Sequence, residues 1–120
     1  MNNAGFARVI KALRAEDTLV FGGFSAGAVV AGPTLRGIDI MDNPNLVPDN
    51  YDPVIIWDGL GLVLCGMIPH FRSLYPKANL ADQAAQYLAD NRLNFKTMKA
   101  GDVIIRENNL SRYFSATDIQ

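Results

Sequence analysis

Apolar residues recur with helical spacing near the start of the chain. They stand at positions i, i+3, i+4 and i+7, which predicts an amphipathic helix over residues 5–15. The apolar face of this helix consists of Phe6, Val9, Ile10 and Leu13. Residues 18–22 (TLVFG) are apolar without alternation, as in a strand buried on both faces. Small residues from Ala26 to Ala31 then predict a helix packed tightly on a sheet.

The second half of the chain carries shorter apolar runs. A helix is predicted over residues 80–90, with Asn79 as its N-cap residue. Strands are predicted at VIIW (54–57) and LVLCGMI (62–68), joined by an Asp58-Gly59 turn, and then at FKTM (95–98), DVIIR (102–106) and LSRYFSA (110–116). Residues 32–53 are rich in Pro, Asn, Asp and Gly and predict a long loop. The order of elements indicates one α/β domain over residues 1–120, with a β-meander at its C-terminal end.

Composition narrows the class of function. The 120 residues are nearly half hydrophobic and carry a net charge of −1, without a basic cluster that would bind nucleic acid or an anionic membrane. No apolar run is long enough to span a bilayer. The single cysteine, Cys65, lies in an apolar run and predicts a buried, inert thiol. A cytoplasmic protein is therefore expected. One histidine and one cysteine provide no metal-ligand cluster, so neither a metal nor another cofactor is expected.

The segment Gly23-Phe24-Ser25-Ala26-Gly27 fits the pattern G-x-S-x-G. In a nucleophile elbow, such a serine stands on a strained turn between a strand and a helix, where small neighbours let the two backbones approach. The N–H groups of Ala26 and Gly23 are the candidate oxyanion donors, with Ala26 at the start of the helix. The alternative is a tight turn in which Ser25 only caps the helix.

A serine nucleophile needs a general base, and the chain has one histidine, His70. It directly follows Pro69, which ends a predicted strand. In α/β sheets, functional sites gather at the carboxyl ends of the strands. His70 is therefore the candidate base, although a lone histidine is also common as an ordinary surface or core residue.

Two motifs, GGFSAGAVVAGPTLR and GLGLVLCGMIPHF, together resemble the aspartyl dipeptidase (peptidase E) family of serine peptidases, which includes cyanophycinases. The resemblance extends from about residue 5 to 107. It implies a doubly wound sheet of the class I glutamine-amidotransferase-like kind, of which this chain is the C-terminal half. It also implies Ser25 as nucleophile, His70 as base and a small peptide as substrate.

The chain departs from this family in length, because family members are roughly twice as long. The strands that normally flank the nucleophile strand, and a glycine-rich segment of the oxyanion hole, have no counterpart here. The elbow strand is therefore expected to expose unpaired backbone. A homo-oligomer is the predicted remedy.

The identity of the acidic residue that would complete a catalytic triad with Ser25 and His70 is also undecided. Ala100 falls where the family carries an acidic residue, and Asp102, two residues on, is the first candidate to orient the imidazole of His70. Asp39, Asp42 and Glu107 are the other carboxylates considered.

Substrate selectivity is open as well. The family's dipeptidases read the substrate aspartate with a basic residue after the histidine, and Ala81 stands where an arginine is expected. Arg72 and Lys77 lie nearby, with ordinary surface roles as the simpler interpretation. Three hypotheses follow: a serine peptidase acting on small peptides, a non-catalytic relative that serves as an assembly module, and an esterase or acyl-transfer enzyme using the same two residues.

Overall fold

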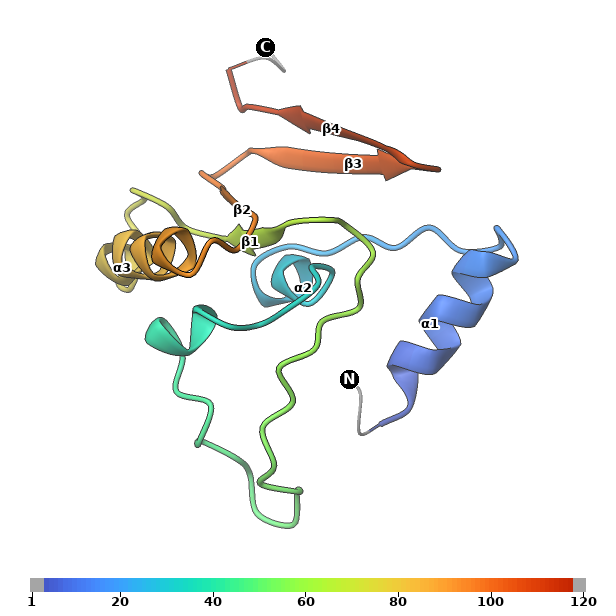
Figure 1. The fold of residues 1–120 in the computed structure, drawn as a ribbon, viewed down its shortest axis with the longest axis horizontal. Helices are drawn as coiled ribbons and strands as arrows, with labels where there is room; N and C mark the ends of the chain where they lie inside the picture. Colours follow the sequence, from blue (N-terminus) through green and yellow to red (C-terminus); the bar gives the residue numbers. More distant parts are fainter. Residues whose placement is uncertain (1–3, 118–120) are drawn as a thin grey trace.

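The computed structural model of the chain describes residues 4–117, which form a small mixed α/β fold (Figure 1). Its helical elements are α1 (Phe6–Ala15), α2 (Ala26–Val29), the 3₁₀ helix η1 (Ile38–Ile40) and α3 (Ala78–Asp90). Its strands are β1 (Gly66–Ile68), β2 (Phe95–Thr97), β3 (Val103–Glu107) and β4 (Leu110–Phe114). The short helix α2 lies at the centre, between α3 on one side and α1 on the other.

Strands β1 and β2 pair in parallel, with Gly66 opposite Phe95, and α3 makes the connection between them. This is a βαβ unit, the usual way to join parallel neighbours. Small alanines on one face of α3 let the helix pack closely on Ile68, and Ala81 and Ala84 are fully buried there. Helix α3 begins at Ala78 with Lys77 at the N-cap position, so the prediction of Asn79 as the cap was wrong.

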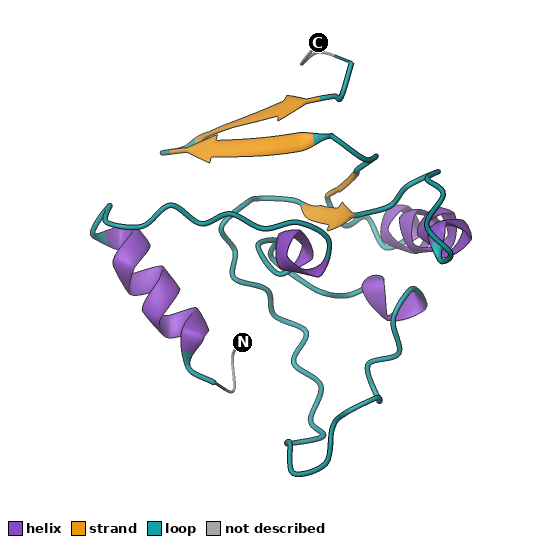
Figure 2. Ribbon diagram, turned by 180° about the vertical axis from the view of Figure 1, so that it is seen from behind, coloured by secondary structure: helices purple, strands orange, loops and turns teal. Residues whose placement is uncertain are grey.

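The predicted β-meander is replaced by two separate two-stranded sheets (Figure 2). Strands β3 and β4 form an antiparallel hairpin with Val103 opposite Phe114, while β2 pairs with β1 and not with β3. The physical reason is that the chain runs back along α3 after β1, which brings β2 alongside β1. A turn at Gly101, whose φ of 89° suits glycine, then redirects the chain into the hairpin. Residues 4–117 thus form a mixed α/β fold with two small sheets, and the doubly wound sheet implied by the family resemblance stays a prediction.

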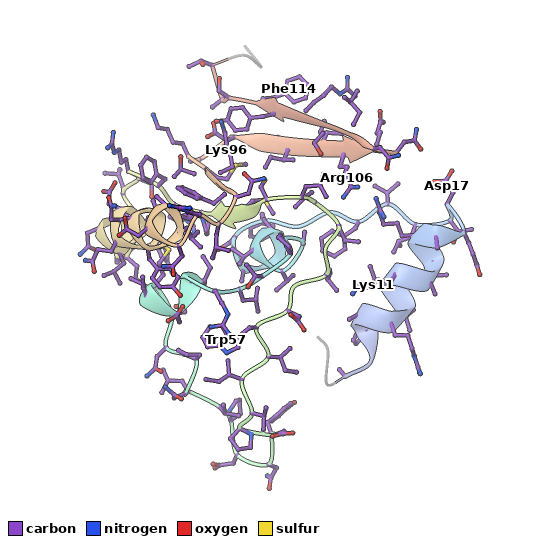
Figure 3. All side chains as sticks on the ribbon, in the orientation of Figure 1. Lys11, Asp17, Trp57, Lys96, Arg106 and Phe114 are labelled. Atoms are coloured by element: carbon purple, nitrogen blue, oxygen red, sulfur yellow. The ribbon has the colours of Figure 1, made fainter. Side chains whose placement is uncertain are left out.

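Side chains join the hairpin to the rest of the fold (Figure 3). Arg106 reaches from β3 and donates from Nη1 to the carbonyl oxygen of Leu62 over 2.9 Å. Lys96 of β2 places its ammonium 3.9 Å from the ring centroid of Tyr113 on β4, which is a cation–π contact. The hairpin thus contacts β2 and the segment that leads into β1.

Segment 59–63 packs against the end of α2. Leu60 N–H donates to the carbonyl of Val30 over 2.7 Å, and Leu62 N–H donates to the carbonyl of Ala31 over 2.8 Å. Ala31, Leu60 and Leu62 are buried in one hydrophobic cluster. This packing holds the helix that follows Ser25 against the segment leading into β1.

Two predicted strands do not form. Residues 18–22 and 54–57 lie in no ladder, and only the last three residues of the 62–68 run are a strand. Val20 is 96% exposed and Phe24 is 88% exposed, so the expected burial of the elbow strand was wrong for this chain. No strand pairs with this segment among residues 4–117, although Phe21 packs against the hydrophobic cluster of Ala31, Leu60 and Leu62. The described helices include none that is both long and apolar enough to cross a membrane.

Candidate active site

Ser25 occupies a strained backbone conformation directly before α2. Its φ is 51° and its ψ is −123°, a combination that an L-residue adopts only at a cost of about 1–3 kcal/mol. Such strain at a serine between an extended segment and a helix is characteristic of a nucleophile elbow. The Ser25 side chain makes no cap hydrogen bond to α2, so the interpretation of this serine as an ordinary helix cap is wrong.

Position 23 has no room for a side chain, so it requires glycine. A Cβ atom there would lie 2.4 Å from the carbonyl oxygen of Gly27 and 2.6 Å from its carbon, which no side chain can accommodate without moving the backbone. At Gly27 itself, an added Cβ atom would meet nothing within 4 Å. The first glycine of the motif therefore lets the incoming segment touch the helix, whereas the second has no such steric requirement in this chain.

Two N–H groups beside Ser25 have no backbone acceptor within residues 4–117. They belong to Gly23 and to Ala26, the first residue of α2. An unpaired N–H at a helix start carries partial positive charge and attracts an anion. Both groups are thus available to a developing oxyanion.

The fold brings His70 to Ser25. The distance between Ser25 Oγ and His70 Nε2 is 3.0 Å, a hydrogen bond between residues 45 positions apart in sequence. His70 follows β1 in a left-handed turn, with a φ of 60°. Two backbone hydrogen bonds with Met98 hold this turn on both sides. Met98 N–H donates to the carbonyl oxygen of Ile68, and Phe71 N–H donates to the carbonyl oxygen of Met98.

The imidazole of His70 has an aromatic neighbour, Tyr75. The two ring centroids are 4.0 Å apart and the ring planes are inclined by 19°, so the rings are stacked. No signal in the sequence had singled out Tyr75, because stacking depends on how the turn after His70 folds.

Asp102 is not joined to His70. Its carboxylate accepts hydrogen bonds from Lys99 N–H (2.8 Å), the Tyr113 hydroxyl (2.7 Å) and Ala116 N–H (3.1 Å). Burial opposes the charge of Asp102, but these three bonds outweigh burial and hold the pKa of its carboxyl below the ordinary value. The structure therefore places Asp102 at the base of the β3–β4 hairpin, and no carboxylate among residues 4–117 hydrogen-bonds to the imidazole.

Replacement of Asp102 by asparagine is expected to destabilise the fold by about 1 kcal/mol at pH 6, a value kept small because the carboxylate is near solvent. A lowered pKa in the folded chain gives stability that is complete above about pH 4 and is lost as pH falls through the folded-state pKa. The difference between the two proteins should thus shrink from pH 6 to pH 3 in urea unfolding. Asp49→Asn, in an exposed loop, is the control; a difference that grew toward pH 3 would contradict this account.

The other candidate carboxylates are also engaged away from His70. Asp39 accepts from Gly37 N–H over 2.9 Å, and Glu107 pairs with Arg112 on the hairpin. Asp42 forms an ion pair with Lys77. None of these residues has a contact with Ser25 or His70 in the described part of the chain.

Basic residues do not gather at the serine either. Lys77 is paired with Asp42, and Arg72 lies 3.7 Å from Asp82 in an exposed ion pair. Ala81 is fully buried against β1, so an arginine at this position of α3 would point into the core. Residues 4–117 thus present no cation in contact with Ser25 that would select an acidic substrate.

Two further features lie apart from the Ser25–His70 pair. A hollow of about 320 Å³ is lined by residues of η1 and of segment 54–57, among them Asp39 and Trp57, and by neither Ser25 nor His70.

Burial raises the pKa of the Cys65 thiol, which disfavours the reactive thiolate. No group of three His, Cys, Asp or Glu side chains within residues 4–117 could hold a metal ion.

Replacement of Ser25 by glycine is expected to give a more stable protein than replacement by alanine. Both changes remove the hydroxyl, but only glycine adopts the φ of 51° without strain. Glycine also adds entropy to the unfolded chain, which offsets part of this advantage. The free energy of unfolding of Ser25→Gly is therefore expected to exceed that of Ser25→Ala by about 1 kcal/mol. Urea unfolding of the two variants measures it, and equal stabilities would show that the elbow holds no strain.

A strained serine before a helix, hydrogen-bonded to a histidine from a distant turn, is characteristic of the class of α/β serine hydrolases. The chain belongs to peptidase family S51, whose sequence model matches residues 1–108. This confirms the resemblance to the aspartyl dipeptidase family.

A solved structure shows the same fold. It is the crystal structure of a candidate peptidase E protein from Listeria monocytogenes EGD-e, with a TM-score of 0.72 and 19% sequence identity. The match covers 95% of this chain and 51% of the Listeria protein, so this chain spans about half of that protein's length. No curated protein matches the chain at a significant level.

Proposed function

We propose that this chain carries the catalytic pair of a serine peptidase that cleaves small peptides in the cytoplasm. The observation that supports the proposal most directly is the 3.0 Å contact of Ser25 Oγ with His70 Nε2 at a strained elbow. With its proton on Nδ1, the imidazole accepts the hydroxyl proton at Nε2. The Ser25 oxygen then bonds to the peptide carbonyl carbon, and the carbonyl π electrons move to its oxygen.

The rest of the cycle uses the same groups. The N–H groups of Ala26 and Gly23, which have no backbone acceptor within residues 4–117, would donate to the oxyanion. The imidazolium of His70 returns the proton to the leaving amine as the carbon–nitrogen bond breaks. Water then gives a proton to His70 Nε2 as its oxygen bonds to the acyl carbon. The ester bond to Ser25 Oγ breaks, and the imidazolium returns the proton to Oγ, which releases the acid and restores the pair. The proposed reaction uses no cofactor.

Hydrolysis of short peptides and of matched esters by the same preparation tests this proposal. Wild-type protein should release amine from the peptides, and Ser25→Ala should abolish release. Ser111→Ala, an exposed serine on β4, is the matched control and should keep full activity. Cleavage of esters alone would favour the esterase hypothesis. Cleavage of neither would overturn the proposal and leave the assembly module as the function.

The exposed elbow segment supports a proposal about assembly. Leu19 to Gly23 form no backbone hydrogen bond within the described chain, and the side chains of Val20 and Phe24 are almost fully exposed. The nearby helix α1 has no buried residue, and its Phe6 is 61% exposed. An unpaired apolar segment readily pairs with another strand.

The occupant we propose is a second copy of this chain, so that the protein is a homo-oligomer. Antiparallel pairing of two identical segments about a twofold axis satisfies both, because each supplies what the other lacks. The partner copy would also lie next to the elbow. Light scattering should show a dimer or larger assembly that Val20→Lys disrupts and Leu46→Lys, at an exposed apolar position in the long loop, does not. A wild-type monomer at micromolar concentration would contradict the assembly.

A further inference from the structure

Two contacts orient the imidazole of His70, a hydrogen bond and a ring stack. Ser25 Oγ lies at Nε2, and the ring face lies on Tyr75, with centroids 4.0 Å apart. A carboxylate orients the base in a serine–histidine–aspartate triad, but no carboxylate within residues 4–117 hydrogen-bonds to His70. The ring of Tyr75 is therefore stacked on one face of the imidazole, where it can restrict the ring plane.

We propose that Tyr75 is a positioning residue for His70. Its ring fixes the plane of the imidazole so that Nε2 points at Ser25 Oγ. When Nε2 takes the hydroxyl proton, the imidazole becomes a cation, and the π face of Tyr75 attracts that cation. This inference rests on the proposed function, since it gives Tyr75 part of the task that an orienting carboxylate performs elsewhere.

Hydrogen bonds of Ser73 connect the backbones of His70 and Tyr75 in the turn between the two rings. The carbonyl oxygen of His70 accepts hydrogen bonds from Ser73 N–H (3.2 Å) and Ser73 Oγ (2.9 Å). Tyr75 N–H in turn donates to Ser73 Oγ over 3.2 Å. Pro76 follows and disfavours helical backbone at Tyr75. Ser73 therefore ties the backbone of His70 to that of Tyr75, and α3 begins only after this tie.

Tyr75 lies outside the hydrophobic core. Its side chain is 44% exposed, and it belongs to neither buried cluster. Loss of the ring should consequently leave the fold intact and change the reactivity of Ser25, which separates positioning from folding.

The test compares Tyr75→Phe, which keeps the aromatic face, with Tyr75→Leu, which removes it, in the whole chain. The rate of Ser25 labelling by a fluorophosphonate should fall about tenfold in Tyr75→Leu, the equivalent of about 1.4 kcal/mol. It should stay within about twofold of wild type in Tyr75→Phe. Tyr51→Leu, an exposed tyrosine in the long loop, is the matched control and should label normally.

A second readout does not depend on activity. His70 is the single histidine, so its ring protons give unambiguous NMR signals, and the stacked Tyr75 ring should shift them upfield. This shift should persist in Tyr75→Phe and disappear in Tyr75→Leu. Wild-type labelling rates in Tyr75→Leu, or equal losses in both variants, would overturn the proposal. A wild-type chain that does not label overturns the proposed function and the catalytic part of this inference, while the NMR comparison still decides the stacking.

Discussion

Replacement of His70 by asparagine should slow the reaction of Ser25 with a fluorophosphonate about a thousandfold. General-base catalysis contributes about 10²–10⁴ in rate, and the 3.0 Å contact at Nε2 is the one base contact of the Ser25 hydroxyl in the described chain. Asparagine is chosen because it tolerates the left-handed φ of 60° at this position better than most residues. Labelling is followed by intact-protein mass spectrometry over time.

The fold must be unchanged for this result to bear on catalysis. Circular dichroism and urea unfolding of His70→Asn should therefore resemble those of wild type. Added imidazole should restore part of the rate, since the space of the missing ring lies beside Tyr75 and Ser25. Labelling of folded His70→Asn at the wild-type rate would show that His70 is not the base.

Replacement of Gly23 by alanine should destabilise the protein by about 2–3 kcal/mol and abolish labelling of Ser25. The added methyl group would lie 2.4 Å from the Gly27 carbonyl oxygen, so the segment before Ser25 must move away from α2. This movement displaces the nucleophile relative to His70 Nε2 and changes the direction of the Gly23 N–H.

Gly27→Ala is the matched control in the same motif. A Cβ atom at Gly27 has nothing within 4 Å, and alanine is the better helix former by about 1 kcal/mol. This variant should be as stable as wild type or slightly more stable, and it should label normally. Equal effects of the two substitutions would refute the close approach of the elbow segment to α2.

The close-packed turn at Ser25 was predictable because it depends on adjacent residues. The small residues around Ser25 predicted a turn of close backbone approach, and the steric requirement at Gly23 agrees with that prediction. The helix expected over residues 5–15 lies at Phe6–Ala15 for the same reason, since its spacing is local. The motif order also led correctly to the peptidase family.

Strand burial and side-chain contacts that depend on residues distant in the sequence were harder to predict. Residues 18–22 have the composition of a buried strand, but composition does not supply the neighbouring strands that would bury it. Asp102 lies two residues from the position where an acid was sought, yet its hydrogen bonds are set by the hairpin turn and by Tyr113. Tyr75 was missed because its stacking follows from a turn tied by Ser73.

An activated Ser25 reacts covalently with a fluorophosphonate, and an ordinary serine does not. The most direct measurement is the mass of the assembled protein after reaction with a fluorophosphonate, followed by peptide mapping of the modified residue. We expect one adduct per chain, located on Ser25 and absent in Ser25→Ala, while the other serines stay unmodified. A folded protein that gains no adduct, or that gains it elsewhere in the chain, would show that Ser25 is not an activated nucleophile.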